Sequence, residues 1–531
     1  MSAPVTASRS ERLPGVRDAV ALESAAVSRT ALRSDRATAA DSLQLDWWVA
    51  AILLVNLAHA LAFSRLYPEH RLDPDLLAYF TFFRNWVVGD ATLHGLAYYT
   101  GPKALLVFTL GALNDVSAAL ACTAVASALL GAAVYLAARD AFGRMPALAA
   151  SAFLLLDPSK AFLTLKSSAD LYLALLLFLA IVLADRGRLV AAALCICLSA
   201  LIKPVTLPCA AYFLAAPGTA RRRWSAALLP FAALPLILLA NHALLGSAFG
   251  GSRFFSEFAS MAAQDPIGPG EVVHYAVWSQ LIKNRFVSTA SWGLIGALLW
   301  LASDRTRINR PLLLMPLLFL AGYVGLSAVL PFPPYFRYFW PLEVWMLVFV
   351  AYGAFEGARR LAGGNQHLRH AIIAVVLALL ADGLIGHQLD YQRDYARPIE
   401  RSLHFAAAAT DVLQSQPDAS VVAPVGLLPY LMWRLPEAGR SGRVDTAERL
   451  AREQLAPRPD WIIDLPRMYK TDASRQWIAA LARDGGYQVY GSDGESTLLV
   501  RPGVAAPHAS APAPANMTGG LPIARDGQAD L

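Results

Sequence analysis

The chain has 531 residues, of which 56% are hydrophobic and only 16% charged, and its mean hydropathy is +0.44. This composition excludes an ordinary soluble domain and indicates a membrane protein with many spanning segments. The formal charge of +6 is small for the length and requires no nucleic-acid partner, because arginines at the ends of membrane spans account for it. The four cysteines all lie in apolar runs, so they predict neither disulfides nor a metal site.

Apolar runs occupy most of residues 46–386 and predict a polytopic α-helical membrane domain. A spanning helix needs roughly 20 apolar residues, and polar residues at the ends would complete the shorter runs. We therefore predict about 11 spans. The runs are Trp47–Phe63, Val116–Ala138, Pro146–Leu156, Leu171–Ala184, Leu189–Leu201, Val205–Ala216, Ala226–Leu245, Phe286–Ala302, Leu312–Leu330, Phe339–Phe355 and Ala371–Ile385.

The distribution of basic residues predicts the orientation of these spans. Alternate short loops are rich in arginine, and they lie on the same side as the N-terminal arm, residues 1–45, which has no apolar stretch and is predicted to be disordered. Positive charge marks the cytoplasmic side of the plasma (inner) membrane. An odd number of spans then places the segment after residue 387 outside. The arginine-rich loops contain Arg139/Arg144, Arg186/Arg188, Arg221–Arg223, Arg305/Arg307/Arg310 and Arg359/Arg360/Arg369.

Three large regions are predicted to lie outside: residues 64–115, 246–285 and 387–503. The first contains an amphipathic stretch, Leu76–Val88, and a short apolar stretch, Lys103–Leu113, and both are predicted to lie in the membrane interface. The last shows alternating helix and strand patterns that predict a small periplasmic α/β domain. Residues 504–531 are predicted to be a disordered tail. The predicted elements of the small domain are helices Arg401–Gln414, Asp445–Gln454 and Ala473–Arg483, strands Ala419–Ala423 and Trp461–Leu465, and a hairpin of Tyr487–Tyr490 with Thr497–Val500.

Two aspartates follow the first span, in the segment Arg71-Leu-Asp-Pro-Asp-Leu-Leu-Ala-Tyr79. A carboxylate at a membrane surface can act as a general base. The same pattern also predicts a helix start, with Asp73 as the N-cap, Pro74 as the first helical residue and Asp75 in the first turn. The two roles are compatible, and the sequence leaves both open.

Four basic residues on the predicted outer side can neutralise a phosphate: Arg337, Lys203, Lys166 and Lys103. Lys203 stands between two short spans, where a charge costs roughly 2.5–3.5 kcal/mol, so a partner or a function is expected for it. Each residue also has an ordinary interpretation. Arg337 could extend to the interface, Lys203 could reach an aqueous loop, Lys166 could pair with Asp170, and Lys103 could contact lipid headgroups.

Together these features resemble the GT-C glycosyltransferases, integral membrane enzymes that take a sugar from a polyprenyl phosphate and that include mannosyltransferases and aminoarabinose transferases. The resemblance covers roughly residues 46–500. It rests on the acidic first outer loop with two interfacial helices and on short spans between 144 and 216, one of which begins at Asp170. It rests also on Pro333-Pro-Tyr-Phe-Arg-Tyr-Phe-Trp-Pro341 and Val425-Gly-Leu-Leu-Pro-Tyr430. Many members have adjacent acids in the first loop, whereas a proline separates the two acids here, so the sequence does not decide which is catalytic.

The resemblance implies an inverting transfer of a monosaccharide from a polyprenyl-phosphate donor to an acceptor hydroxyl on the outer face. Asp73 or Asp75 would be the general base, and the four basic residues would bind the donor phosphate. The expected partners are this donor and membrane lipid. The sugar is left open, as is the acceptor, which could be a glycan, a lipid or a protein. The residues that would bind substrate are Tyr98, Tyr99, Asp170 and Tyr338.

The loop at 246–285 contains the candidate metal ligands of the outer side. Their spacing matches no known template, and members of the resembled family that use monosaccharide donors often need no metal, so we expect a solvated loop and no cofactor. The candidate ligands are Glu257, Asp265, Glu271 and His274.

Two other functions are open besides a transferase. A lipid or glycan transporter without catalytic activity would be expected to have acids or broken helices near the middle of the membrane and a repeated architecture. Here the acids gather at the predicted outer ends of the spans. A scaffold whose outer domain binds a partner would leave Lys203 and the acidic pair unexplained. The transferase is therefore our main hypothesis, and the transporter is the alternative.

Overall fold

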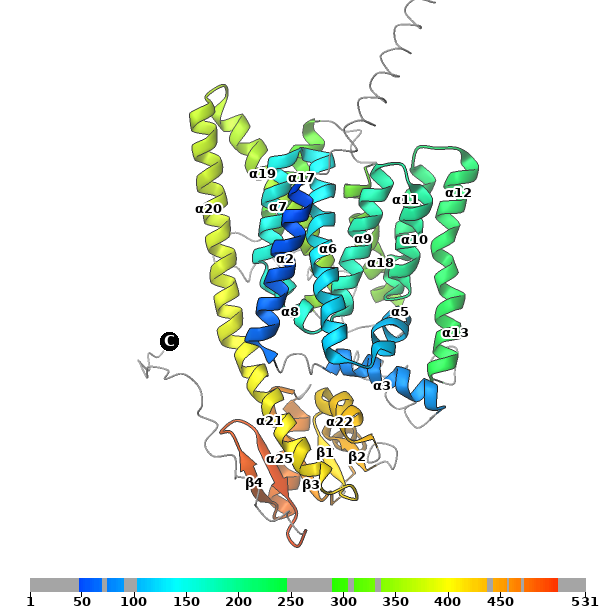
Figure 1. Cartoon of the computed structure of the whole chain (residues 1–531), viewed down its shortest axis with the longest axis vertical. Helices are drawn as coiled ribbons and strands as arrows, with labels where there is room; N and C mark the ends of the chain where they lie inside the picture. The colour runs from blue at the N-terminus through cyan, green and yellow to red at the C-terminus, as the bar shows by residue number, and fades with distance from the viewer. Residues whose placement is uncertain are drawn as a thin grey trace, which may run out of the picture. The chain divides into compact units, whose positions relative to one another are not determined.

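The computed structural model describes residues 47–68, 74–89, 103–245, 289–303, 310–329, 336–436, 443–455, 458–468 and 472–504 (Figure 1). The chain divides into two units, Met1–Ala51 and Ile52–Leu531. In the first unit only the beginning of helix α2 (Trp47–Leu66) is described, and the rings of Trp47 and Trp48 stack there with centroids 3.7 Å apart. The rest of α2 and all later elements belong to the second unit. The predicted N-terminal arm and the tail after residue 504 lie outside the described residues.

The membrane domain is an assembly of helices, and the described residues of each predicted apolar run are helical, except for Leu201 and Ala216 at the ends of two runs. Four described helices are long and apolar enough to cross a membrane, and the bent pair α7–α8 would make a fifth. The predicted count of about 11 spans stays a prediction. The helices after α2 are α3 (Pro74–Val88), α5 (Ala104–Leu106), η3 (Val107–Gly111), α6 (Val116–Phe142), α7 (Arg144–Leu156), α8 (Pro158–Leu165), α9 (Ala169–Asp185), α10 (Leu189–Ala200), η4 (Pro204–Ala210), α11 (Ala211–Ala215), α12 (Ala220–Leu228), η5 (Leu229–Ala232), α13 (Ala233–Leu245), α17 (Thr289–Ser303), α18 (Pro311–Val329), η8 (Phe336–Phe339), α19 (Trp340–Ala362), α20 (Gln366–Tyr391) and η9 (Gln392–Ala396). Helix α21 (Arg397–Gln414) follows and begins the C-terminal unit.

Polar residues between the apolar runs start several of these helices. A side-chain oxygen at the N-cap accepts a hydrogen bond from one of the first backbone N–H groups, which have no partner inside the helix. Asp115 accepts from the amide of Ala118 at 2.7 Å, and Asn365 accepts from Leu368 at 3.0 Å. Asp157 caps α8 by accepting from the amide of Ser159 at 2.9 Å. Asp157 is therefore the N-cap of α8, and Pro158 follows it at the first helical position.

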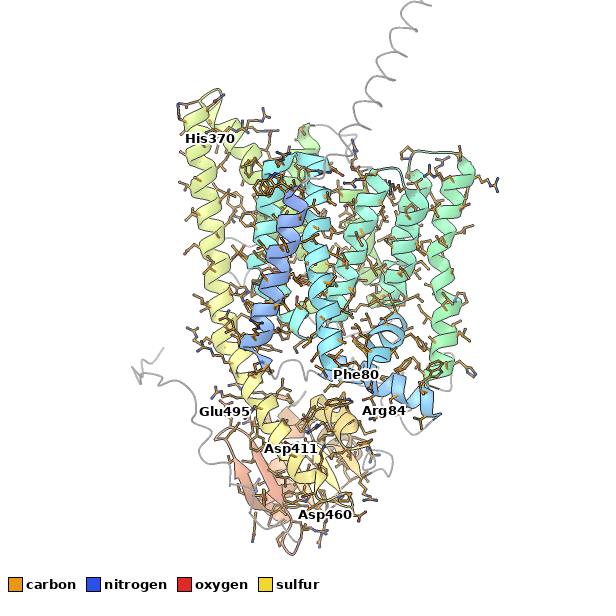
Figure 2. All side chains as sticks on the ribbon, in the orientation of Figure 1. Phe80, Arg84, His370, Asp411, Asp460 and Glu495 are labelled. Carbon is orange, nitrogen blue, oxygen red and sulfur yellow. The ribbon has the colours of Figure 1, made fainter. Side chains whose placement is uncertain are left out.

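The described parts of the arginine-rich loops lie at one end of the helix assembly, which we call the arginine end. Arg186 pairs with Asp140 and Arg310 with Asp185, each at 2.9 Å. These contacts join the ends of α6, α9 and α18, as expected for helices that alternate in direction. Figure 2 shows that His370, near the start of α20, lies far along the helices from Phe80 and Arg84 of α3. We call that opposite end the α3 end.

Glycines allow several helices to approach one another closely. A Cβ atom on Gly296 of α17 would stand 2.0 Å from the carbonyl oxygen of Phe349 in α19. A Cβ atom on Gly322 of α18 would stand 2.1 Å from the carbonyl oxygen of Val205 in η4. Small residues at such contacts are typical of helix packing in membranes, where van der Waals contact drives association. Gly322 thereby sets the position of η4, which follows Lys203.

The C-terminal segment folds into a small α/β unit around a five-stranded sheet of order β2-β1-β3-β5-β4. Strands β2, β1 and β3 are parallel, whereas β5 runs antiparallel to β3 and β4. The predicted strands and hairpin are present, and the sequence missed β2 and α22. The elements are β1 (Val421–Ala423), η10 (Val425–Leu427), α22 (Leu428–Arg434), β2 (Val444–Thr446), α24 (Ala447–Glu453), β3 (Trp461–Asp464), η11 (Pro466–Met468), α25 (Asp472–Asp484), β4 (Gln488–Ser492) and β5 (Thr497–Val500).

Helix α3 (Pro74–Val88) differs from the predicted interfacial helix. Every residue from Leu76 to Phe82 is at most 3% exposed, because α22 covers the face that was expected to meet solvent. The opposite side packs on α5 (Ala104–Leu106) and η3 (Val107–Gly111). Only the end of α3 retains an interfacial character: Trp86 is 44% exposed, and its ring contacts Phe108 at 5.2 Å.

Replacing Gly322 by alanine should destabilise the protein, because the added methyl group would overlap the carbonyl oxygen of Val205. Overpacking of this kind typically costs about 1–3 kcal/mol. Gly325, three residues further along α18, is the matched control, since no atom stands within 4 Å of its Cβ position. Gly325→Ala should be neutral or stabilising, because alanine is the better helix former. Thermal unfolding in detergent measures both variants, and equal melting temperatures would contradict the close contact.

Candidate functional site

A buried ion pair joins the beginning of α9 to the end of α10. The Nζ atom of Lys203, which precedes η4, donates to Oδ1 of Asp170 in the first turn of α9. The Lys203 side chain is 14% exposed and the Asp170 side chain 2%. The sequence predicts a partner or a function for Lys203, and the structure supplies the partner. Asp170 thus pairs across 33 residues with Lys203.

The late aromatic motif meets this ion pair through Tyr338 of η8. The Nζ atom of Lys203 stands 4.0 Å from the centroid of the Tyr338 ring. A cation over a desolvated aromatic face gains about 2 kcal/mol or more. The Tyr338 ring stacks in turn on Tyr323 of α18, with centroids 6.3 Å apart. Arg337 precedes Tyr338 in η8, and its side chain lies outside the described residues.

Helices α3 and α5 bring two further predicted residues to the same end. Lys103 begins α5, and its Nζ atom stands 5.6 Å from the ring centroid of Tyr79 in α3. The amide of Leu105 donates to the carbonyl of Leu201 at 3.5 Å, so α5 begins beside the end of α10, two residues before Lys203. Asp75 is one turn before Tyr79 in the same helix, and such residues share a helix face.

These residues define what we call the lysine site: Lys103, Lys203, Asp170, Tyr79 and Tyr338. Its core is continuous, because Tyr79, Leu106, Ala169 and Ile202 belong to one cluster of buried side chains. The described side chains of the site carry two ammonium groups and one carboxylate. The excess of positive charge suits the binding of an anionic ligand.

The start of α3 is where the sequence predicts it, at Pro74. Asp73 lies outside the described residues, and of Asp75 only the place in the first turn of α3 is described. The base and capping roles of the two aspartates both stay predictions. Tyr98, Tyr99 and the candidate metal ligands of the 246–285 loop also lie outside the described residues. Within the part of the chain that the structure describes, no group of three or more His, Cys, Asp or Glu residues could hold a metal.

Lys166 has a different environment from the other predicted phosphate ligands. Its Nζ atom stands 4.2 Å from the ring centroid of Phe162 in α8. The Phe162 ring contacts Tyr391 at 5.5 Å and Tyr395 at 5.2 Å, near the end of α20. Lys166 therefore contacts a group of aromatic rings beside α20 and η9.

A second buried polar cluster, absent from the predictions made from the sequence, surrounds the break between α7 and α8. Lys160 donates to Oδ1 of Asn56 in α2, and Asp157 accepts from Nε1 of Trp340 at 2.7 Å. Lys160 and Asp157 are each 1% exposed. Asp157 also interacts electrostatically with Lys160 and with Glu343 of α19. The sequence does contain a feature that could have indicated this cluster: Lys160 follows Asp157 by three residues, and both lie between two apolar runs.

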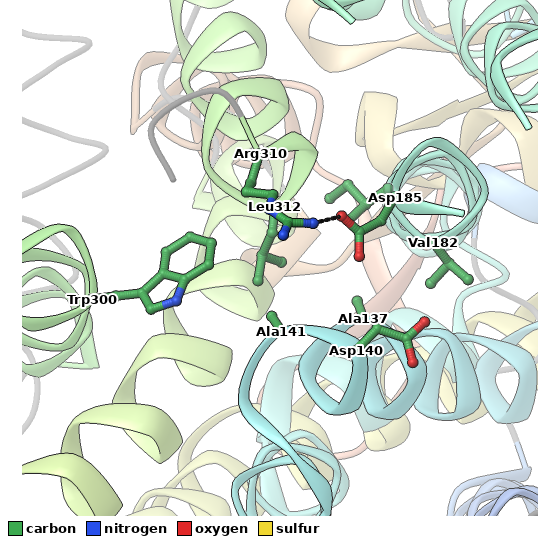
Figure 3. Close-up of a pocket in the computed structure, with 9 residues that line it drawn as sticks. Ala137, Asp140, Ala141, Val182, Asp185, Trp300, Arg310 and Leu312 are labelled. Atoms are coloured by element: carbon green, nitrogen blue, oxygen red, sulfur yellow. Dashed lines mark hydrogen bonds and ion pairs between the residues drawn. The ribbon is translucent and has the colours of Figure 1, made fainter. Parts of the chain in front are cut away.

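A cavity of about 100 Å³ lies at the arginine end, remote from the lysine site. Figure 3 shows Asp185 and Arg310 paired with each other at this cavity, which Trp300 and Leu312 also line. Their ion pair has a length of 2.9 Å. Its other carboxylate, Asp140, is paired with Arg139 and Arg186. Both acids are thus neutralised by arginines, which indicates that this group ties helix ends together.

Removing one partner of the Lys203–Asp170 pair should destabilise the protein. A buried charge left without its partner costs about 3–5 kcal/mol. Lys203→Met and Asp170→Asn should each lower the free energy of unfolding, and the double variant should lose less than the two losses combined. Chemical unfolding in detergent measures this double-mutant cycle. Arg393→Met, which removes a surface pair with Asp394, is the control and should behave as wild type. Strictly additive losses would show that the two charges do not depend on each other.

The chain is similar to known proteins in structure, at low sequence identity. A scan against protein-family models and a search of curated proteins each found no match. Among solved structures, ArnT from Cupriavidus metallidurans bound to undecaprenyl phosphate matches 86% of this chain and 98% of its own, with 15% identity and a TM-score of 0.52.

Two further solved structures are similar over comparable lengths. The apo state of the same ArnT matches 85% of this chain and 97% of its own, with 17% identity and a TM-score of 0.49. An oligosaccharyltransferase from Archaeoglobus fulgidus, tethered with an acceptor peptide, matches 87% and 74%, with 14% identity and a TM-score of 0.46. The match to lipid-bound ArnT spans nearly the whole of that protein. The chain therefore shares the fold of ArnT.

Proposed function

We propose that this chain is a membrane glycosyltransferase that transfers a monosaccharide from a polyprenyl-phosphate donor to an acceptor hydroxyl. The reaction would take place at the α3 end, which would face the extracytoplasmic side of the plasma membrane, and would invert the anomeric centre. The observation that carries the proposal is the lysine site, where Lys203 is held by Asp170 and Tyr338 beside the start of α5, and Lys103 of α5 contacts Tyr79 of α3. Its support is the fold shared with ArnT, a protein crystallised with undecaprenyl phosphate.

The donor phosphate would be bound by the basic residues of this end. Lys203 and Lys103 would contribute point charges, and Arg337 beside Tyr338 would contribute a planar fork that can bind two phosphate oxygens at once. Lys203 is already fixed by its ion pair and by the Tyr338 ring. A charge fixed in this way needs little reorganisation when negative charge develops on the leaving phosphate. Lys166 would be a more distant contributor beside α20.

An aspartate at the start of α3 would be the general base. It would take the proton of the acceptor hydroxyl as the oxygen attacks the anomeric carbon and the bond from that carbon to the phosphate oxygen breaks. The polyprenyl phosphate would leave with the bonding electron pair. A helix N-terminus favours the ionised carboxylate, which suits this role. Of the two aspartates, we slightly prefer Asp73 as the base.

The remaining substrate contacts and the path of the lipid are consistent with the same arrangement. Asp170, Tyr338, Tyr98 and Tyr99 would contact the sugar or the acceptor. The exposed apolar end of α3, Trp86 to Val88, would lie against the membrane, where a polyprenyl chain could approach the site. No cofactor is included in the proposal.

A lipid or glycan transporter is the second candidate function, and one observation favours it. The break between α7 and α8, with a bend of 58°, buries Asp157 and Lys160 inside the helix assembly. Broken helices with buried charges are typical of transport sites. The transferase agrees better with the position of the lysine site at the ends of the helices.

Incubation of the purified protein with a panel of radiolabelled polyprenyl-phosphate sugars tests the proposal. One donor should be hydrolysed or used for transfer, and Asp73→Asn or Asp75→Asn should reduce that rate about 10²–10⁴-fold, the usual contribution of a general base. Melting temperatures should stay near that of wild type. Asp115→Asn is the matched control, because Asp115 caps α6 at the same end and asparagine caps equally well.

The outcomes separate the possible functions. Full activity in both aspartate variants would refute the assignment of the base. If activity and melting temperature fall together, the loss of the helix cap explains the loss of activity. Wild-type protein that transfers no sugar but moves labelled lipid across a proteoliposome membrane would identify the transporter.

Substitution of the proposed phosphate ligands should weaken donor binding. Arg337→Ala and Lys103→Ala each remove a charge-assisted hydrogen bond of about 1.5–3 kcal/mol, which corresponds to roughly 10–100-fold in dissociation constant. Binding of the lipid-phosphate donor to each purified variant provides the measurement. Arg65→Ala is the control, since Arg65 is an exposed basic residue in the last turn of α2. An unaltered donor affinity would remove the substituted residue from the site.

A further inference from the structure

The last turn of α22 is capped by a residue from α3, about 350 residues earlier in the chain. The last four carbonyl groups of a helix have no partner within it. Arg84 of α3 donates from Nη2 to the carbonyl of Met432 at 2.9 Å and from Nη1 to that of Trp433 at 3.4 Å. Figure 2 shows Arg84 on α3, on the side that faces the C-terminal unit. A guanidinium also carries the charge that a helix C-terminus favours.

The same two helices share a hydrophobic core. Leu76 to Phe82 of α3 lie in one buried cluster with Leu427, Tyr430 and Leu431 of the C-terminal unit. The segment from Val425 to Tyr430, one of the motifs that carry the family resemblance, therefore serves to bury α3. Arg84 stands at the edge of this contact, and both hydrogen bonds run from one helix to the other.

The segment that Arg84 caps, η10 followed by α22, is fixed to other helices of the C-terminal unit. The amide of Val425 donates to Oε2 of Glu448 in α24 at 2.8 Å. A Cβ atom on Gly426 would stand 3.0 Å from the carbonyl oxygen of Met468, so this backbone packs closely on η11. The carbonyl of Arg434 accepts from Gln414 of α21 at 3.4 Å. Helix α22 and the η10 turn that leads into it are thus attached to three other elements of the C-terminal unit, and α3 is attached to α22.

The geometry of α3 makes this attachment relevant to the site. Arg84 follows Asp75 by nine residues, which is about 14 Å along a helix axis at 1.5 Å per residue. A tilt of about 4° around Arg84 would move the start of α3 by about 1 Å over that length. A misplacement of about 1 Å can reduce catalysis 10²-fold.

We propose that Arg84 is a positioning residue, through which the C-terminal unit holds the start of α3 in place at the lysine site. The functional part of this inference rests on the proposed transferase activity. The C-terminal unit is then a component of the site that acts through α3 without touching the substrate. Arg84 itself contacts the carbonyls of α22 and binds neither donor nor acceptor.

Three variants of the full-length protein test the inference. Arg84→Met keeps the apolar stem and removes both hydrogen bonds. Arg84→Lys keeps the charge and can donate to one of the two carbonyls at a time, so it should restore part of the effect. Arg434→Met is the matched control. It removes an arginine of α22 that pairs with the exposed Asp411 at 2.6 Å and leaves the carbonyl acceptors of Arg84 unchanged.

Two measurements are needed: hydrogen exchange of the amides in α3, and kcat and KM with the donor identified by the panel. In Arg84→Met, exchange over residues 76–83 should become faster and kcat should fall about 10²-fold, whereas the donor KM should change less than about threefold. Arg84→Lys should lie between that variant and wild type. Arg434→Met should match wild type in both measurements. If Arg84 had only a structural role, Arg84→Met would lower the stability and the amount of active protein. It would not lower kcat at a nearly constant KM, and Arg84→Lys would not restore part of kcat.

Unchanged exchange in Arg84→Met would overturn the inference, and so would faster exchange with an unchanged kcat. An equal effect of Arg434→Met would also overturn it, because that residue does not contact α3 in the described hydrogen bonds. Failure of the proposed function would show differently, as a wild-type protein that uses none of the donors. In that case the exchange of α3 alone decides whether Arg84 holds this helix.

Discussion

The ion pair between Lys203 and Asp170 is the interaction around which the candidate site is arranged. Helix α9 has 17 residues, which is the lower limit for a membrane span, and α10 has only 12 residues, which is too short for one. An unpaired charge at such a depth costs roughly 2.5–3.5 kcal/mol. Pairing removes most of this cost and lets a lysine stand where the chain turns from α10 into η4. The ring of Tyr338 also contacts the ammonium group of Lys203.

The position of α3 is the second condition for the site, and the membrane helices alone do not set it. Residues 76–82 are buried between η3 on one side and α22 on the other. The segment from α3 to η3 and the C-terminal unit therefore form one hydrophobic core, although more than 300 residues separate Arg84 from Met432. A helix buried in this way is more rigid than one floating in the membrane interface, and a rigid helix start suits residues that must be placed accurately.

Local patterns in the sequence predicted the local structure. The predicted apolar runs are helical, and α3 begins at Pro74 as predicted. Lys203 has a partner, as the cost of a charge between two short spans led us to expect. Contacts between distant segments could not be read from those patterns. The amphipathic pattern of α3 was correct, but its polar face met α22 instead of water. The partner of Lys203 was Asp170, on a helix whose orientation relative to α10 depends on packing. The contact of Lys160 with Asn56 could not be predicted either, because 104 residues separate the two in the sequence.

The two buried polar clusters differ in a way that bears on function. Around the α7–α8 break, Lys160 and Asp157 are each 1% exposed and bind groups from α2 and α19, so their hydrogen bonds hold helices together. In the lysine site, the Lys203 side chain keeps 14% of its surface exposed, and it lies where short helices end and α3 and α5 begin. A fixed cation that retains access to its surroundings can bind an arriving anion, whereas one that is fully enclosed cannot. The lysine site is therefore the better place for phosphate chemistry, and the cluster at the break is better suited to supporting the helices that carry it.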